Sequence, residues 1–238
     1  MQPIIVPIFK DNYAYIIPAS DHETIVIDPG EAESVIEALE SMARKATHII
    51  NTHHHWDHKN GNPQLAQKYG CEVFAPEKER DNIPHITYGF KDGETLEIGN
   101  IHLQVIETPG HTMGGCCLYD ADNACVYTGD TLFIMGCGRL FEGTPRDMWN
   151  SFQKLKALPD ETKVYCGHEY TLANAAFCMR VEPENKALKA RYAELKELRR
   201  AKQPTVPSTI QDEKETNLFF NAPSAQDFAL LRALKDKG

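Results

Sequence analysis

The chain has 238 residues, of which 42% are hydrophobic and 25% are charged. This composition is typical of a globular protein and excludes a disordered chain, a collagen-like repeat and a coiled-coil rod. The net charge of −9 argues against nucleic acid or an anionic membrane as a partner, because both require a basic face on the protein. An anionic substrate must therefore be held by specific cationic side chains.

The cysteines and the amino-terminal residues bear on localisation. The seven cysteines are an odd number and lie scattered in apolar runs, which favours reduced, intracellular thiols over disulfides. No apolar stretch approaches the roughly 18 residues that a membrane span needs. Residues 1–11 contain no basic segment followed by an apolar one, so nothing there resembles a secretory signal. We therefore expect a cytoplasmic protein without a membrane partner.

Strand and helix patterns alternate up to about residue 167. Strands are predicted over residues 2–9, 14–18, 24–27, 46–51, 72–75, 94–98, 101–108, 115–119, 124–128 and 163–166. A helix is predicted over residues 31–42, where apolar side chains recur at helical spacing. Asn62 is predicted as the N-cap of the next helix, with Pro63 in its first position, and Thr144 is predicted to cap a third.

The strand pattern stops near residue 172. Helices are predicted over residues 172–181, 185–202, 209–221 and 224–235, with Ser224 as the N-cap of the last. From Arg180 onward the chain has 12 Lys and Arg against 9 Asp and Glu, so this tail is locally basic. We expect an α/β domain over residues 1–168 and an all-helical domain over residues 169–238.

A cluster of metal-ligand residue types follows the strand predicted over residues 46–51. Four histidines and one aspartate lie within six residues, namely His53, His54, His55, Asp57 and His58. Imidazole and carboxylate are ligands of zinc and other divalent first-row metals. His53 and His55 are two residues apart, so an extended chain projects both to one side. His54 and Trp56 are then expected to point the other way, into packing.

Three later segments place one further ligand type each at the end of a strand. In each, an apolar run is followed by glycine and then by His111, Asp130 or His168. Glycine allows a sharp turn there, and side chains at strand ends are where α/β proteins commonly build their sites. Two sets of ligands result, and Asp130, with two carboxylate oxygens, could bridge two ions.

These motifs resemble the metallo-β-lactamase superfamily and, within it, the glyoxalase II family. The resemblance rests on the pattern Thr-His-x-His-x-Asp-His at 52–58, Thr-Pro-Gly-His-Thr at 108–112, Gly-Asp-Thr-Leu-Phe at 129–133, Gly-Cys-Gly-Arg-Leu-Phe-Glu-Gly at 136–143 and Gly-His-Glu-Tyr-Thr at 167–171. It covers nearly the whole chain. It implies a four-layer αβ/βα sandwich with a carboxy-terminal helical domain, and hydrolysis of S-D-lactoylglutathione and related 2-hydroxyacyl thioesters to glutathione and the free acid, as in methylglyoxal detoxification.

The resemblance also implies two divalent metal ions per chain, with zinc expected and iron or manganese as alternatives. One ion would be held by His53, His55 and His111, and the other by Asp57, His58 and His168, with Asp130 between them. A hydroxide bridging the ions would attack the thioester carbonyl, its pKa lowered by the cations. These seven ligands are the predicted catalytic residues, and Asp57 is expected to align the hydroxide.

Glutathione carries two carboxylates, and the resemblance assigns its contacts to five residues. They are Arg139, Phe141, Tyr170, Arg232 and Lys235. Some members of the family have Lys and Tyr where this chain has Arg139 and Phe141, so one hydroxyl contact is expected to be missing. Cys137 lies between two glycines and is interpreted as a small loop residue, since no separate base is evident for catalysis.

Three other functions remain open on the sequence. A persulfide dioxygenase would share the fold and much of the histidine motif but use a single iron. Another hydrolase of the superfamily would act on lactones, β-lactams or RNA, although an acidic chain makes RNA improbable. A non-catalytic metal-binding protein is disfavoured by the full set of seven ligands. We expect the chain to act as a monomer.

Overall fold

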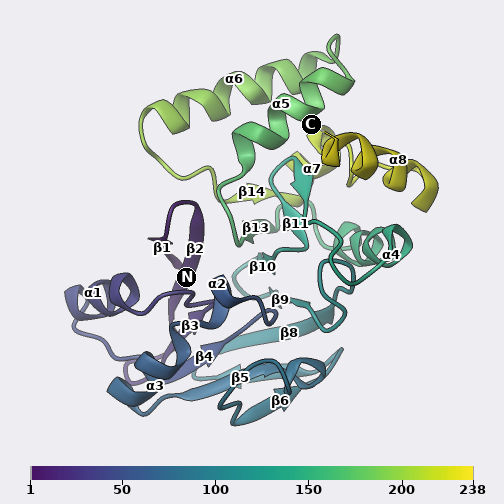
Figure 1. Cartoon of the computed structure of the whole chain (residues 1–238). Helices are drawn as coiled ribbons and strands as arrows, with labels where there is room; N and C mark the ends of the chain where they lie inside the picture. Colours follow the sequence, from purple (N-terminus) through teal and green to yellow (C-terminus); the bar gives the residue numbers. More distant parts are fainter. Residues whose placement is uncertain (1, 238) are drawn as a thin grey trace. The chain divides into compact units, whose positions relative to one another are not determined.

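The computed structural model describes residues 2–237 (Figure 1). The chain divides into two compact units. Unit 1 comprises the chain up to Glu107 together with Gly114–Asn123, and unit 2 comprises Thr108–Met113 and the chain from Ala124 onward. No helix within residues 2–237 is both long and apolar enough to cross a bilayer.

Unit 1 is built on a six-stranded mixed sheet. Its strands, in spatial order, are β1 (Ile4–Ile8), β2 (Asn12–Pro18), β3 (Thr24–Ile27), β4 (His48–Ile50), β5 (Glu72–Pro76) and β6 (Tyr88–Phe90). The first two pairings are antiparallel, whereas β3 to β6 run parallel. Parallel strands end at the same edge of a sheet, so the loops that follow β3 and β4 leave from one side.

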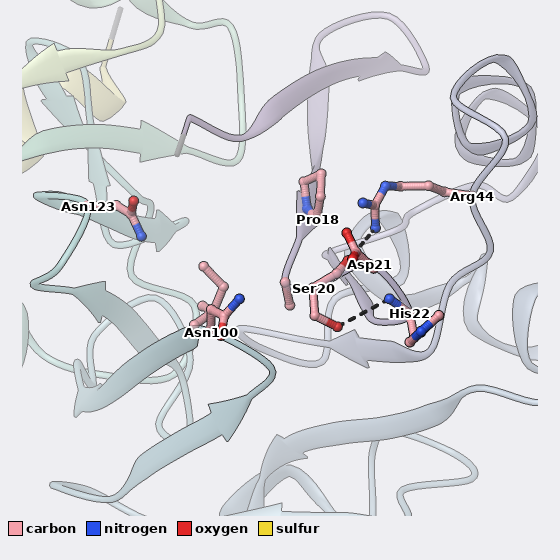
Figure 2. Close-up of a pocket in the computed structure, with 9 residues that line it drawn as sticks. Pro18, Ser20, Asp21, His22, Arg44, Asn100 and Asn123 are labelled. Carbon is pink, nitrogen blue, oxygen red and sulfur yellow. Dashed lines mark hydrogen bonds between the residues drawn. The ribbon is translucent and has the colours of Figure 1, made fainter.

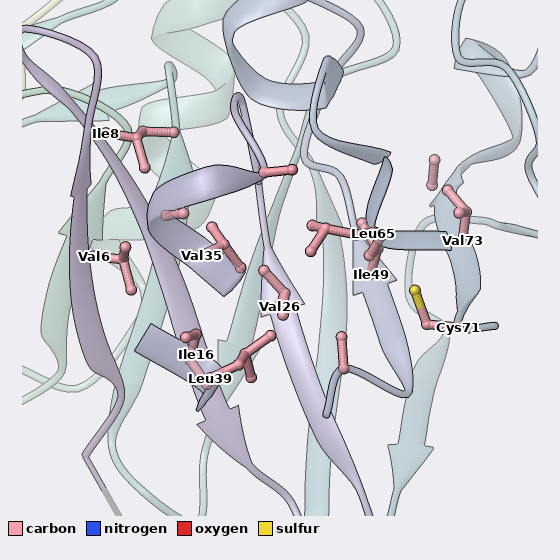
Figure 3. Close-up of a cluster of buried hydrophobic side chains, with 14 of the residues drawn as sticks. Val6, Ile8, Ile16, Val26, Val35, Leu39, Ile49, Leu65, Cys71 and Val73 are labelled. Atoms are coloured by element: carbon pink, nitrogen blue, oxygen red, sulfur yellow. The ribbon is translucent and has the colours of Figure 1, made fainter. Parts of the chain in front are cut away.

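Helices α1 (Glu33–Ser41) and α3 (Asn62–Tyr69) cover one face of this sheet. Val35 and Leu39 of α1 are fully buried and pack in one cluster with Val26 and Ile49 of the sheet (Figure 3). Each such side chain contributes about 1.5–3 kcal/mol when it leaves water. This buried layer fixes the positions of the strand ends, and with them the positions of the residues in the loops that follow.

The rest of unit 1 is formed by two short helical elements and three antiparallel strands. They are the short helix α2 (Trp56–Lys59), the 3-10 turn η1 (Glu77–Glu79), and the strands β7 (Thr95–Ile98), β8 (Ile101–Glu107) and β9 (Cys116–Asp120). β8 pairs with β7 on one side and with β9 on the other. The predicted strands over this segment are confirmed to within two residues.

The start of α3 differs from the prediction. Gly61, not Asn62, occupies the N-cap, so the prediction of Asn62 as the cap is wrong. Asn62 is buried and its amide donates to Asn51 Oδ1 at 2.6 Å. Gly61 donates its N–H to Pro29 O at 2.8 Å, and a Cβ at this position would lie 2.5 Å from that oxygen. Close backbone contact therefore requires glycine here.

Unit 2 combines a small sheet with five helices. The strands are β10 (Cys125–Gly129), β11 (Leu132–Phe133), β12 (Gly136–Cys137), β13 (Lys163–Cys166) and β14 (Ser208–Thr209), and the helices are α4 (Pro145–Lys156), α5 (Thr171–Val181), α6 (Lys186–Arg200), α7 (Ile210–Thr216) and α8 (Ala225–Asp236). β10 pairs in parallel with β13, which pairs antiparallel with β14. β11 and β12 form a separate two-stranded hairpin.

Aromatic side chains form the core between the helices of unit 2. Phe152 of α4 lies 5.3 Å from Phe220 and 5.6 Å from Phe228, measured between ring centroids. Phe177 of α5 stacks on Phe219 at 5.5 Å. Such pairs add about 0.5–1.5 kcal/mol beyond their buried area. The α8 helix, with the predicted N-cap Ser224, is thereby packed against the same core as α4 and α5.

Candidate metal centre

The loop after β4 brings three histidines of unit 1 together. The ring of His53 lies 4.8 Å from that of His55 and 4.2 Å from that of His58. His55 is the extended N-cap residue of α2, and His58 lies within that helix. The sharp change from strand to helix over a few residues therefore gathers imidazoles that are adjacent in sequence around one point.

Asp28, which follows β3, orients side chains of this cluster through hydrogen bonds. Its carboxylate accepts hydrogen bonds from the Thr52 backbone N–H and hydroxyl, both at 2.7 Å, and lies 3.1 Å from His58 Nδ1. Because a carboxylate only accepts, His58 must carry its proton on Nδ1, which leaves Nε2 as the ligand atom. Asp28, His53 and His58 also place ligand atoms within 4.8 Å of one another.

Thr52 extends the same orientation to His53. The Thr52 hydroxyl donates its only proton to Asp28 and lies 3.0 Å from His53 Nδ1. It must then accept a hydrogen bond from that nitrogen, so His53 also presents Nε2 as its lone-pair atom. One buried carboxylate thus fixes the tautomers of two predicted ligands.

Asp57 is held by contacts from other parts of unit 1. The Asn12 amide donates to Asp57 Oδ2 at 2.9 Å, and Asp57 Oδ2 lies 3.8 Å from His58 Nε2. A Cβ at Gly30 would lie 1.9 Å from the Asp57 carbonyl oxygen, so this approach requires glycine. The carboxylate is thereby turned toward the same side as His58.

The two remaining members of the loop behave differently from each other. His54 Nδ1 lies 2.6 Å from the buried Glu79 carboxylate, so this ring is used in packing, as predicted. Trp56 is 60% exposed and rests its ring against Phe9 at 5.3 Å. The prediction that Trp56 points into packing is therefore wrong, because α2 is too short to bury its outer face.

Unit 2 contains a second group of predicted ligands. Asp130 Oδ2 lies 3.3 Å from His111 Nε2 and 3.3 Å from His168 Nε2, and all three residues are buried. Asp130 follows β10 and His168 follows β13, which pair in parallel, so their ends lie side by side. Gly129, with φ of 46°, makes the turn that leads into Asp130.

Neighbouring groups set the rings of both histidines. His111 Nδ1 lies 2.7 Å from the Arg139 carbonyl oxygen, which only accepts, so Nδ1 carries the proton and Nε2 faces Asp130. The His168 ring stacks on Tyr170 at 4.5 Å with an interplanar angle of 7°. Phe133 meets that ring edge-on at 5.8 Å. Both imidazoles thus present Nε2 to one carboxylate oxygen.

A cationic cluster lies on α8 in the same unit. Arg232 is buried, and its guanidinium donates to Cys137 O at 3.3 Å and to Asp236 Oδ1 at 2.7 Å. Arg139 Nε approaches Asp236 at 4.0 Å, although its side chain is 70% exposed. Asp236 therefore brings Arg139, on the loop after β12, and Arg232, on α8, to the same carboxylate.

Lys235 is the second cation of this cluster. Its ammonium contacts Asn174 Oδ1 and lies 5.7 Å from the Phe177 ring centroid and 5.6 Å from that of Phe219. Burial against these rings lowers the pKa of Lys235 to about 8. An anion bound beside this ammonium would raise its pKa again, because a nearby negative charge favours the protonated form.

Two aromatic residues complete the predicted substrate contacts. Phe141 is 62% exposed and meets His111 edge-on at 5.3 Å. Tyr170, stacked on His168, is also exposed. Both rings therefore lie against predicted metal ligands and remain accessible to a substrate.

Comparison with known proteins supplies the family. Residues 9–168 match the Metallo-beta-lactamase superfamily, and residues 169–238 match the Hydroxyacylglutathione hydrolase C-terminus. The chain is 42% identical to the hydroxyacylglutathione hydrolase of Pelagibacter ubique, over 99% of both chains. It is 43% identical to that of Methylococcus capsulatus, over 93% of this chain and 87% of the relative. The chain belongs to the hydroxyacylglutathione hydrolase family.

Solved structures agree on the fold of this hydroxyacylglutathione hydrolase family member. ETHE1 from Myxococcus xanthus superposes with a TM-score of 0.70 at 24% identity, covering 95% of this chain and 90% of that one. BLEG-1 B3 metallo-beta-lactamase gives 0.71 at 23% identity, covering 92% and 99%. At these identities the likeness establishes the metallo-beta-lactamase fold, as predicted, and no more.

Sequence reasoning missed the residues that orient the ligands in this family member. Asp28, Asn12 and Thr52 each hydrogen-bond a predicted ligand or its partner. Asp28 directly follows the strand predicted over residues 24–27, much as Asp130 follows the end of another strand. That shared position at a strand end was the available signal.

The cysteines offer no nucleophile. All seven are buried free thiols. Burial raises the pKa of Cys137, and it raises that of Cys166 to about 12. A thiol with a raised pKa is poorly nucleophilic, which agrees with the interpretation of Cys137 as a small loop residue.

A surface hollow of about 470 Å³ in unit 1 is separate from the ligand cluster of that unit (Figure 2). It lies beside the start of β3, where Pro18 pairs with Thr24, whereas Asp28 follows the other end of the strand. Arg44 in its wall donates to Ser20 O at 2.9 Å and to Thr24 Oγ1 at 3.1 Å. This guanidinium serves to tie the turn, and the hollow adds nothing to the metal centre.

Proposed function

We propose that this chain hydrolyses S-D-lactoylglutathione and related 2-hydroxyacylglutathiones to glutathione and the free hydroxy acid. The observation that carries the proposal is the match of residues 169–238 to the hydroxyacylglutathione hydrolase C-terminus, together with about 42% identity to a named hydrolase over the whole chain. The basic cluster on α8 lies in this matched segment, and it provides the cations that an anionic tripeptide requires.

We further propose that the two ligand groups act together on two divalent ions, zinc in the first instance. His53, His55 and His111 would hold one ion, Asp57, His58 and His168 the other, and Asp130 would bridge them. The donor chemistry supports this, because every member is an imidazole or a carboxylate. The fixed Nε2 lone pairs of His53, His58 and His111 also support it, since a ligand histidine needs its other nitrogen protonated and held.

Such ions, when bound, polarise a carbonyl oxygen and lower the pKa of water toward neutrality. The chain's own residues then have distinct tasks. Asp57, held by Asn12, would accept a hydrogen bond from the attacking group and align it with the thioester. Phe141 and Tyr170 would shield the reacting group from bulk water beside His111 and His168.

The proposed substrate contacts are Arg139, Phe141, Tyr170, Arg232 and Lys235. Arg232 and Lys235 would receive the glutathione carboxylates, because a buried guanidinium and a partly dehydrated ammonium form strong charge-assisted hydrogen bonds. Phenylalanine at position 141 offers no hydroxyl, so this contact would be apolar only. We take residues 1–168 as the catalytic domain and 169–238 as the substrate-binding domain of a cytoplasmic monomer.

Loss of thioester absorbance tests the proposal directly. S-D-lactoylglutathione should be hydrolysed, whereas a lactone and a β-lactam run beside it should turn over at least about a hundredfold more slowly in kcat/KM. A parallel assay measures oxygen consumption with glutathione persulfide and tests the persulfide dioxygenase alternative. Oxygen uptake without thioester hydrolysis would transfer the assignment to that class.

A further inference from the structure

The β11–β12 hairpin of unit 2, Leu132–Cys137, is held by polar side chains from the carboxy-terminal helices. These side chains bind its backbone groups as follows: Asn174 donates to Ile134 O (3.0 Å), Met135 N–H donates to Glu213 (2.9 Å), Cys178 donates to Met135 O (3.4 Å), Asn217 donates to Phe133 O (3.2 Å) and Gly136 O (3.0 Å), and Arg232 donates to Cys137 O (3.3 Å). Side chains from three helices thus bind backbone groups along the whole hairpin, although most backbone groups in proteins pair with other backbone.

Glu213 of α7 is the centre of this network and is fully buried. One carboxylate oxygen accepts from Met135 N–H at 2.9 Å and from the Asn217 amide at 2.8 Å, and the other accepts from the Ser208 hydroxyl at 2.7 Å. Burying a carboxylate is costly unless it is hydrogen-bonded. The three donors meet that requirement, so the acid is built into the fold and is not an accident of packing.

Met135, at the tip of the turn, shows why the network is needed. Its φ is 54°, in the left-handed region that side chains other than glycine avoid. Such a conformation costs of order 1–3 kcal/mol and persists only where the surroundings over-determine it. Glu213 binds the Met135 N–H and Cys178 binds its carbonyl, so both sides of the strained residue are fixed.

The stem of the hairpin connects two parts of the proposed site. Gly138 N–H donates to Thr131 O at 3.2 Å, and a Cβ at Gly138 would lie 1.9 Å from Asp130 O. Arg139 follows directly, and its carbonyl accepts from His111. A shift of the hairpin would therefore move Arg139, the predicted glutathione contact that directly follows Gly138.

We propose that Glu213, acting through Asn217 and Met135, is a positioning residue for glutathione recognition. It fixes the β11–β12 hairpin so that Arg139 and the Cys137 carbonyl that holds Arg232 stay in register for the substrate. The inference rests on the proposed function, because it deepens the account of the same site. It concerns a residue that touches neither substrate nor metal.

The test compares Glu213→Ala, Glu213→Asp and Glu213→Gln with the wild-type protein. Glutamine can keep the acceptor for Met135 and Asn217 and donate its N–H to the Ser208 hydroxyl. We expect Glu213→Ala and the shorter Glu213→Asp to raise KM for S-D-lactoylglutathione, and Kd for glutathione itself, about tenfold with kcat within threefold. Glu213→Gln should restore both constants.

A matched control removes stability from the same helix without touching the hairpin. Thr209→Ala deletes the capping box of α7, in which Thr209 accepts from Asp212 N–H at 3.0 Å. It should lower Tm but leave KM and the glutathione Kd unchanged. Equal KM in all Glu213 variants, or a KM rise in Thr209→Ala as large as in Glu213→Ala, would overturn the inference.

The wild-type measurements separate this inference from the function on which it rests. If the wild type neither binds glutathione nor hydrolyses the thioester, the proposed function fails. If it does both and Glu213→Asp binds glutathione equally well, only the positioning role of Glu213 fails. Because Glu213→Asp keeps the charge and most of the volume, it remains informative even where Glu213→Ala does not fold.

Discussion

Asp28 determines which ring nitrogen of His58 carries the proton. The carboxylate accepts from His58 Nδ1 at 3.1 Å and from two groups of Thr52. Replacing it by asparagine changes the size little but places an amide N–H against Nδ1. The ring would then have to protonate Nε2, the atom that a metal needs.

Asp28→Asn should therefore weaken zinc binding by about 10–100-fold, as loss of a group that orients a metal ligand generally does. Competition with a chromophoric chelator measures the affinity. The exposed Asp21, which is not part of the ligand network, provides the control Asp21→Asn. Equal affinity in Asp28→Asn and wild type would show that Asp28 does not orient a ligand.

Arg232 and Lys235 are predicted to hold the carboxylates of glutathione. The double variant Arg232→Ala, Lys235→Ala should raise KM for the thioester by about 100-fold or more, since two charge-assisted hydrogen bonds are lost. Metal content should not change. Lys237→Ala, an exposed cation one position beyond Asp236, is the control for net charge. An unchanged KM in the double variant would remove α8 from substrate recognition.

Glu213 also makes the stability of the protein depend on pH. Burial raises the pKa of Glu213 to about 7 from the ordinary 4.5, and the hydrogen bonds from Ser208, Asn217 and Met135 only partly oppose this. The folded protein then binds the proton more tightly than the unfolded chain. This contribution to stability is complete below pH about 4.5 and is lost as the pH rises to about 7.

Glu213→Gln cannot ionise, so its stability lacks this pH dependence. The free energy of unfolding of the variant, relative to that of the wild type, should therefore increase by about 3 kcal/mol between pH 4.5 and pH 8. Urea unfolding of both proteins across this range measures the difference. A difference that stays constant with pH would show that Glu213 does not titrate with a raised pKa.

At the scale of elements, helix caps were predictable where a side chain does the capping. Thr144 and Ser224 were identified from sequence and both accept from the N–H three residues on. Asn62 also belongs to the residue types that favour an N-cap, but its side chain makes a buried hydrogen bond to Asn51, and Gly61 occupies the cap. Local sequence propensity cannot predict a hydrogen-bond partner that lies in a distant part of the chain.

Short strands were missed for a related reason. β6, β11, β12 and β14 have two or three residues each, too few to show a period of two. Their pairing depends on neighbours that fold beside them, as the Glu213 network does for the β11–β12 hairpin. The predicted helix over 209–221 likewise ends at Thr216, where Asn217 turns its side chain into that network.

The capping box of α4 gives a test at this scale. Thr144 and Asp147 satisfy each other's backbone N–H groups at the start of the helix. Thr144→Ala should lower the free energy of unfolding by about 1 kcal/mol, which corresponds to a Tm about 2–4 °C lower in a chain of this size. Thr144→Ser should restore most of it. An unchanged Tm in Thr144→Ala would mean that the cap does not limit stability.

At the scale of the whole molecule, the candidate metal ligands could be predicted from the sequence. The residues that orient those ligands by hydrogen bonds could not. Histidines and aspartates directly after strands predict a metal centre, because few other roles require that pattern. Asp28, Asn12 and Glu213 act through hydrogen bonds between segments distant along the chain. Such partners are set by the folded topology, which no local pattern encodes.

The central claim is that the ligand groups of the two units serve one pair of divalent ions on which hydrolysis depends. Metal titration into the chelator-treated protein, with S-D-lactoylglutathione hydrolysis measured at each step, tests it most directly. We predict no turnover without metal, binding of about two equivalents per chain, and one equivalent fewer in both His55→Ala and His168→Ala. Undiminished hydrolysis after chelation, or a protein that binds no divalent metal, would contradict the account.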